Sequence, residues 1–153
     1  NKIIIFAKEH RYGYKGYEHQ WASAPSSKNW KIVEILNALK INSEIDNIIP
    51  KIFVIPHLEK FQVAHFKLYA KQNNFDISLN HRNREYNDFI TLYNTYNYII
   101  TKTGDNCVRE SNRKNLNNIK EFFNNNNKEF IAIDSFILPD SSIATIYKNK
   151  SSF

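Results

Sequence analysis

The chain has 153 residues, a length typical of one domain, and 42% of them are hydrophobic, which argues against an intrinsically disordered protein. Its net charge is +6, but no run of five or six Lys and Arg residues occurs, so we expect a mildly basic, solvated surface and no nucleic-acid partner. The single cysteine, Cys107, excludes an internal disulfide, and we expect a passive thiol.

Strand-like and helix-like patterns alternate along most of the chain. Short Ile-rich runs predict strands, and apolar residues at helical spacing predict helices. In chain order we expect strand Lys2–Ala7, helix Asn29–Leu39, strand Lys51–Ile55, helix Lys60–Gln72, strand Phe75–Leu79, helix Arg84–Tyr93, strand Tyr96–Thr101, helix Asn112–Asn125, and strands Glu129–Leu138 and Ile143–Tyr147.

Local signals add detail to these elements. Ser27 or Asn29 is the expected N-cap of the first helix, since both side chains accept hydrogen bonds from a first turn. The second helix is expected to present one apolar face made of Phe61, Ala64 and Leu68.

The order of elements predicts a three-layer, Rossmann-like α/β fold, in which helices flank a mostly parallel sheet that ends in a C-terminal antiparallel β-hairpin. We expect a single domain over residues 1–153. Because the chain starts at Asn1 and contains no Met, we expect it to be a piece excised from a larger protein. No apolar run approaches the roughly 20 residues of a bilayer span.

Polar side chains follow the predicted parallel strands, whose carboxyl ends meet at one edge of such a sheet, where ligands usually bind. The loops contribute Lys8, Glu9 and His10, then His57 and Glu59, then Asn80, His81 and Arg82, and finally Lys102 to Asp105. The predicted ligand-binding residues are His57, His81, Lys102, Thr103, Gly104 and Asp105.

Three kinds of chemistry are conceivable at this edge. The spacing of His10, His57 and His81 fits no local metal motif, so we expect no metal. Gly104, with a hydroxyl and a charge beside it, either helps to bind an anion or only supplies a positive φ where the strand ends. Because no nucleotide fingerprint and no GxSxG elbow occur, we predict no cofactor and no catalytic residue.

A further alternative concerns the predicted loop Tyr12–Ser27, which is unusually aromatic. Its aromatic side chains are Tyr12, Tyr14, Tyr17 and Trp21. They either pack on the body of the domain or stack on sugars or at a membrane interface.

Four blocks of sequence, taken in order, resemble a known family. They are Asn29-Trp30-Lys31-Ile32-Val33-Glu34-Ile35-Leu36; Val54-Ile55-Pro56-His57 followed by Phe66-Lys67-Leu68-Tyr69-Ala70; Tyr98-Ile99-Ile100-Thr101-Lys102-Thr103-Gly104; and Phe136-Ile137-Leu138-Pro139-Asp140-Ser141-Ser142-Ile143-Ala144-Thr145-Ile146-Tyr147. In this order they resemble the C-terminal soluble region of polytopic membrane glycosyltransferases of the dolichyl-phosphate-mannose–protein mannosyltransferase type.

The resemblance implies a membrane-associated, extracytoplasmic accessory domain of an enzyme that transfers sugar from a polyprenyl-phosphate donor. The catalytic carboxylate would belong to the transmembrane portion of the same protein, and this domain would carry no catalytic residue. It would help to bind a glycan acceptor or the polyprenyl-phosphate sugar, or it would stabilise the membrane part. Two positions depart from the family pattern. Ser141 stands where the family-like turn has glycine, which predicts a type I turn without a positive φ, and His57 stands where an acid is usual.

Two other functions remain open on the sequence. One is a stand-alone soluble α/β enzyme or binding protein for a small anionic or phosphorylated ligand. The other is an interaction module that uses the Tyr12–Trp21 loop.

Overall fold

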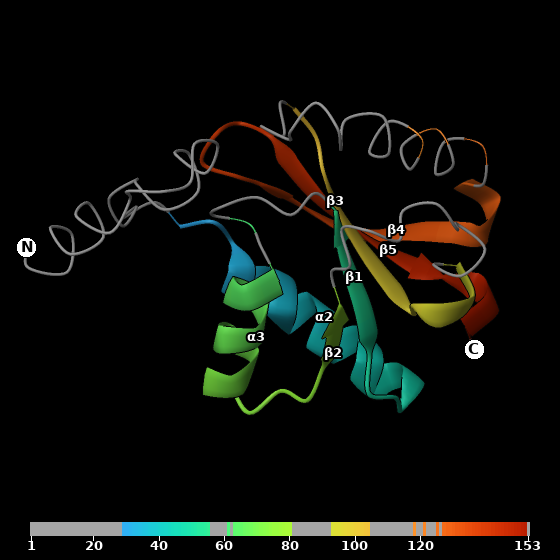
Figure 1. Cartoon of the computed structure of the whole chain (residues 1–153), viewed down its shortest axis with the longest axis horizontal. Helices are drawn as coiled ribbons and strands as arrows, with labels where there is room; N and C mark the ends of the chain where they lie inside the picture. Colours follow the sequence, from blue (N-terminus) through green and yellow to red (C-terminus); the bar gives the residue numbers. More distant parts are fainter. Residues whose placement is uncertain are drawn as a thin grey trace, which may run out of the picture.

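The computed structural model describes residues 29–55, 61, 63–80, 93–104, 118, 121, 125 and 127–152 (Figure 1). Its elements are α2 (Ile32–Asp46), β1 (Lys51–Ile55), α3 (Val63–Gln72), β2 (Ser78–Asn80), β3 (Tyr98–Lys102), the 3-10 turn η1 (Asn127–Glu129), β4 (Phe130–Ile137), β5 (Ile143–Asn149) and the 3-10 turn η2 (Lys150–Ser152). The predicted strand Lys2–Ala7, the aromatic loop Tyr12–Ser27 and most of the helices Arg84–Tyr93 and Asn112–Asn125 lie outside the described residues.

The described strands form one mixed sheet in the order β2-β1-β3-β5-β4. β1 runs parallel to β2 and β3, whereas β5 runs antiparallel to both β3 and β4. The C-terminal hairpin is therefore confirmed, but a mostly parallel sheet is not, because two of the four pairings between described strands are antiparallel. The cause is the short β4–β5 turn, which sends the chain back as β5 between β3 and β4.

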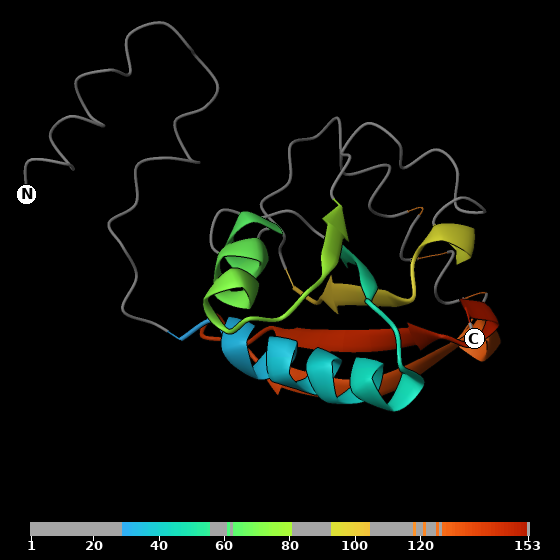
Figure 2. The same cartoon turned by 90° about the horizontal axis from the view of Figure 1, so that it is seen from below.

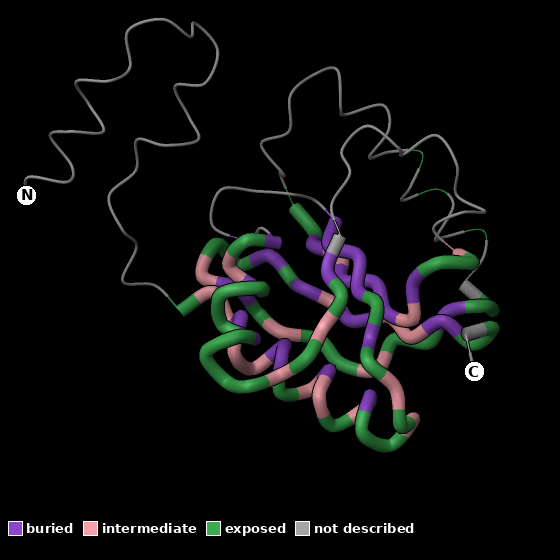
Figure 3. Tube along the Cα trace, turned by 60° about the horizontal axis from the view of Figure 1, so that its bottom comes forward, coloured by how far each residue is buried: buried purple, intermediate pink, exposed green. Residues whose placement is uncertain are grey.

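Both described helices cover the same face of the sheet (Figure 2). Alternate residues of the strands point to this face, and those in its core are Ile52, Val54, Leu79, Tyr98, Ile100, Ala144 and Ile146. Phe53 and Ile99 are buried on the opposite face, where the Phe53 ring lies 5.0 Å from that of Tyr96. Both faces of β1 and β3 are thus buried, which explains their continuous apolar sequence (Figure 3).

Helix α2 is longer than the sequence prediction and begins differently. Its buried stripe continues through Leu39 to Ser43, and the helix ends at Asp46. Asn47 is the C-cap: its N–H bonds the Glu44 carbonyl, and its left-handed conformation brings the Ile48 N–H to the Ser43 carbonyl. The predicted N-cap was wrong: Lys31 occupies that position, with φ 60° and no side-chain cap. Asn29 still stabilises the start of the helix, because its Oδ1 accepts a hydrogen bond from the Lys31 N–H at 2.8 Å.

Helix α3 faces the core with a different stripe from the predicted one. Val63, Phe66 and Ala70 are buried, whereas Ala64 and Leu68 are exposed. Phe61 is buried too, but it precedes the helix and packs edge-on against the Phe66 ring at 5.2 Å. The sequence prediction treated Phe61 as the first apolar residue of the helix and chose the stripe that continues from it through Leu68. The helix instead buries the stripe that contains Phe66, whose side chain is larger than that of Leu68.

Candidate functional site

The carboxyl ends of the three parallel strands meet at one edge of the sheet, as the sequence predicted. In the register of the sheet, Ile55 at the end of β1 lies beside Thr101 of β3, and Phe53 lies beside Asn80, the last residue of β2. Because β5 is antiparallel to β3, its first residues lie at the same edge, with Ala144 beside Lys102. The β4–β5 turn therefore joins this edge.

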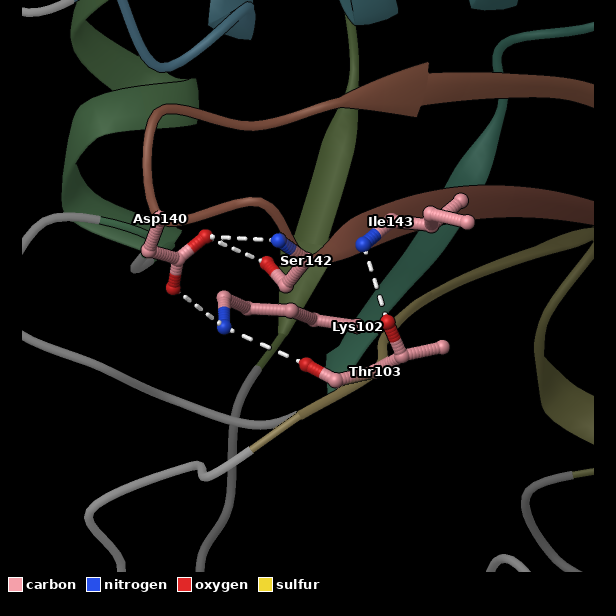
Figure 4. A network of polar contacts seen from close by, with 5 residues as sticks. All are labelled: Lys102, Thr103, Asp140, Ser142 and Ile143. Atoms are coloured by element: carbon pink, nitrogen blue, oxygen red, sulfur yellow. Dashed lines mark hydrogen bonds and ion pairs between the residues drawn. The ribbon is translucent and has the colours of Figure 1, made fainter.

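We call the described part of this edge the β3 rim; it consists of Lys102, Thr103, Gly104, Asp140 and Ser142. Figure 4 shows all of these residues except Gly104. The rim contains three of the six predicted ligand-binding residues. The other three, His57, His81 and Asp105, lie outside the described residues, as does Cys107.

Lys102 is buried, and an acidic partner neutralises its charge. It follows Tyr98 and Ile100 on the helix-covered face, so its side chain points into the domain and is 0% exposed. The ammonium Nζ lies 2.8 Å from Asp140 Oδ2 and donates to the Thr103 carbonyl at 3.2 Å. A buried ammonium without a partner would be strongly destabilising, so this ion pair fixes the β4–β5 turn against the end of β3.

Asp140 is the rim residue that the sequence prediction missed as a site residue. Its Oδ1 accepts hydrogen bonds from Ser142 Oγ at 2.5 Å and from Ser142 N at 3.2 Å. Burial by itself would raise the pKa of Asp140, but hydrogen bonds from Lys102 and Ser142 and the Lys102 charge outweigh it and lower the pKa to about 2. From the sequence, Asp140 is recognisable only as part of the Pro-Asp turn between the last two predicted strands, because nothing local to it shows that β5 lies next to β3.

Thr103 and Gly104 have backbone roles at the rim. Thr103 N donates to the Ile143 carbonyl, and Ile143 N donates to Thr103 Oγ1, each at 2.9 Å. Gly104 has φ 81°, and an added Cβ would lie an ordinary 3.5 Å from Ser142 Cβ. Of the two roles left open for Gly104, the geometry favours the supply of a positive φ. A side chain would fit in the space, but L-residues rarely adopt this backbone conformation.

The β4–β5 turn corrects another sequence expectation. Ser141 has φ 63°, although we expected no positive φ at this position. Ser141 N donates to the Leu138 carbonyl at 2.9 Å, and Leu138 N donates to the Ser142 carbonyl at 2.8 Å. A three-residue loop whose last residue is left-handed is a common hairpin connection, and its geometry requires the positive φ whichever residue stands there.

A second polar cluster closes the opposite end of β3. Asp46, at the end of α2, accepts hydrogen bonds from the Tyr98 hydroxyl at 2.7 Å and from Lys148 Nζ at 2.6 Å. Burial would raise the pKa of Asp46, but these two donors and the Lys148 charge hold it below its ordinary value. Burial, followed by the hydrogen bond to Asp46, raises the pKa of Tyr98. This cluster ties α2 to the sheet.

The β3 rim offers a charge-balanced set of hydroxyl, carboxylate and carbonyl groups. Its lysine is ion-paired, and its two hydroxyl groups already contact backbone or carboxylate partners. Among the described residues, no group of three or more His, Cys, Asp and Glu side chains could hold a metal ion. The three histidines that the sequence offers for a metal site, His10, His57 and His81, lie outside the described residues.

Comparisons with known proteins identify no relative. No protein-family model matches the chain, and neither the curated proteins nor the solved structures contain a match. Within the part of the chain that the structure describes, no helix has both the length and the apolar character needed to cross a bilayer.

Proposed function

We propose that this chain is an accessory, non-catalytic domain of a membrane glycosyltransferase that uses a polyprenyl-phosphate sugar donor. Its β3 rim would help to bind the acceptor glycan or the sugar of the donor. The proposal places the domain on the extracytoplasmic side, next to the transmembrane portion of the same protein. The resemblance of the four sequence blocks supports the family, and the geometry of the rim supports the role.

The observation that carries the role is the Lys102–Asp140 ion pair. Because Asp140 lies 2.8 Å from Lys102 Nζ, the lysine adds no net positive charge to the described rim. A phosphate would have to compete with Asp140 for this ammonium, which argues against the alternative of a soluble protein for a small anionic ligand. A neutral, hydroxyl-rich sugar faces no such competition and can exchange hydrogen bonds with exposed carboxylate and backbone groups.

The polar groups of the rim also support a role without covalent chemistry. Thr103 Oγ1 accepts the Ile143 N–H, and the Ser142 hydroxyl donates to Asp140. Because Asp140 is paired with Lys102 and its pKa is lowered to about 2, this carboxylate is too weak a base to activate a hydroxyl near neutral pH. A nucleophilic hydroxyl needs a stronger general base beside it to be activated. Binding and positioning are therefore the functions that this geometry favours.

The proposal also covers the fold of the complete domain. The described strands form a mixed sheet with a parallel half, β2-β1-β3, and an antiparallel half, β3-β5-β4. We propose that the complete domain is Rossmann-like, with helices on both faces of the sheet. Burial of Phe53 and Ile99 on the face opposite α2 and α3 supports the third layer.

A titration followed by NMR tests the proposed role. Methyl α-mannoside and a water-soluble short-chain isoprenyl-phosphate mannose would be added separately to the ¹⁵N-labelled domain. We expect concentration-dependent shifts at the amides of Thr103, Gly104 and Ser141. The amides of Lys51 and Asn97, at the opposite end of the parallel strands, are the internal control. Shifts confined to the control end, or none with either sugar, would overturn the proposal.

A further inference from the structure

Helix α3 has an outer face whose described side chains are exposed. Ala64, Lys67, Leu68, Tyr69 and Lys71 are all exposed, and we call this set the α3 outer face. Leu68 is 53% exposed and Tyr69 is 38% exposed. Because Val63, Phe66 and Ala70 already supply the core contacts of the helix, these two side chains are surplus to its packing.

The charged residues of α3 are all basic. Its sequence, Val-Ala-His-Phe-Lys-Leu-Tyr-Ala-Lys-Gln, contains no Asp or Glu. Lys67 and Lys71 are four residues apart and therefore lie one above the other beside Leu68. The other exposed apolar stripe on a described helix, Ile41 and Ile45 of α2, differs in this respect, since Lys40 and Glu44 form an ion pair beside it.

This combination has the chemistry of a membrane-surface contact. At the boundary between headgroups and acyl chains, a Leu side chain enters the apolar layer and a Tyr ring lies at headgroup level. Lysine stems follow the apolar surface while their ammonium groups reach anionic headgroups. An acidic residue on the same face would be repelled there, and α3 has none.

We propose that the α3 outer face binds an anionic lipid surface through Lys67 and Lys71, with Leu68 and Tyr69 inserted at the interface. The exposure and charge of α3 alone support this contact, which goes beyond the sugar-binding role of the β3 rim and does not depend on it. Such a contact would hold the domain in a defined orientation on a membrane.

Vesicle co-sedimentation tests the proposal. The whole chain would be mixed with vesicles of phosphatidylcholine containing phosphatidylglycerol, and with vesicles of phosphatidylcholine alone. We expect binding to the anionic vesicles that weakens as salt rises. Lys67→Gln combined with Lys71→Gln should lower the partition coefficient about thirtyfold, since each lysine near an anionic surface contributes about a factor of five. Leu68→Ser should lower it about tenfold.

The matched control removes the same charge elsewhere. Lys51→Gln combined with Lys128→Gln changes two exposed lysines outside α3 and should change the partition coefficient less than about threefold. Circular dichroism would verify that all variants are folded.

Three results would overturn the proposal. They are equal binding to both kinds of vesicle, an equal loss in the control variant, and binding to polyglutamate without binding to anionic vesicles, which would indicate an acidic protein partner. The α3 variants should leave the mannoside shifts at the β3 rim unchanged, so failure of one proposal is distinguishable from failure of the other.

Discussion

Replacing either partner of the Lys102–Asp140 pair should have very different effects on stability. Asp140→Asn leaves an ammonium that is 0% exposed without its counter-charge. Removing one partner of a fully buried pair costs about 3–5 kcal/mol. Because 39% of the Asp140 side chain is exposed and water can partly replace it, we expect a loss of about 2 kcal/mol in the free energy of unfolding.

Lys102→Met should cost much less. It removes the buried charge, keeps an apolar stem beside Tyr98 and Ile100, and leaves Asp140 hydrated and bonded to Ser142. We expect a change of less than about 1 kcal/mol, and the double variant should resemble Lys102→Met. Urea unfolding at pH 7 measures all three, with the m-value unchanged. A loss below about 0.5 kcal/mol for Asp140→Asn, or equal losses for the two single variants, would refute the reasoning.

The same pair predicts how stability depends on pH. The pKa of Asp140 is lowered from 3.8 to about 2, so its contribution to folding is complete above pH 3.8 and is lost as the pH falls toward 2. At about 1.4 kcal/mol per pH unit the contribution has an upper limit of about 2.5 kcal/mol, which we reduce to about 1–1.5 kcal/mol because the carboxylate is partly exposed and screened. Asp140→Asn should lack this component of acid destabilisation. An unchanged acid profile in this variant would contradict the ion pair.

Three further predictions concern the fold. Ser141→Gly should stabilise the protein by about 0.5 kcal/mol, measured by thermal unfolding, because relief of the left-handed conformation slightly outweighs the entropy of the unfolded glycine; a lower melting temperature would count against the turn geometry. Tyr98→Phe should cost about 1.5–2 kcal/mol in urea unfolding, since it removes a hydrogen bond to the Asp46 carboxylate; a neutral result would exclude that contact. Phe66→Ala should lower the free energy of unfolding by about 3–5 kcal/mol, and Leu68→Ala by less than about 0.5 kcal/mol, in urea unfolding. A larger loss for Leu68→Ala would support the apolar face that the sequence predicts for α3.

Much of the described fold could be read from local patterns. The strand Lys51–Ile55 was predicted at its observed bounds, because a continuous apolar run before a proline leaves few other structures. The hairpin could be predicted because Pro139 and Asp140 form a strong turn signal between two apolar runs. The antiparallel pairing of β4 with β5 confirms it. The meeting of the ends of β1 and β3 also follows from the alternation of strands and helices.

Two errors arose where local patterns allowed more than one solution. Helix α3 has apolar residues on two stripes, and only the shape of the core decides that Phe66 enters it while Leu68 stays outside. At the β4–β5 turn, composition favoured a turn without positive φ, but closure of the hairpin imposes φ 63° on Ser141. Tertiary contact overrode a weak local preference in both cases.

Within the described residues, local patterns alone predict the order of strands and helices and place Lys102, Thr103 and Gly104 at the carboxyl end of a buried strand. The contact between Asp140 and Lys102 arises only when the sheet is assembled. The two residues are 38 positions apart in the sequence, and no local pattern signals the contact, because it depends on β5 inserting antiparallel between β3 and β4. Strand order is set by the burial of whole faces, a property of the assembled sheet and not of any one segment.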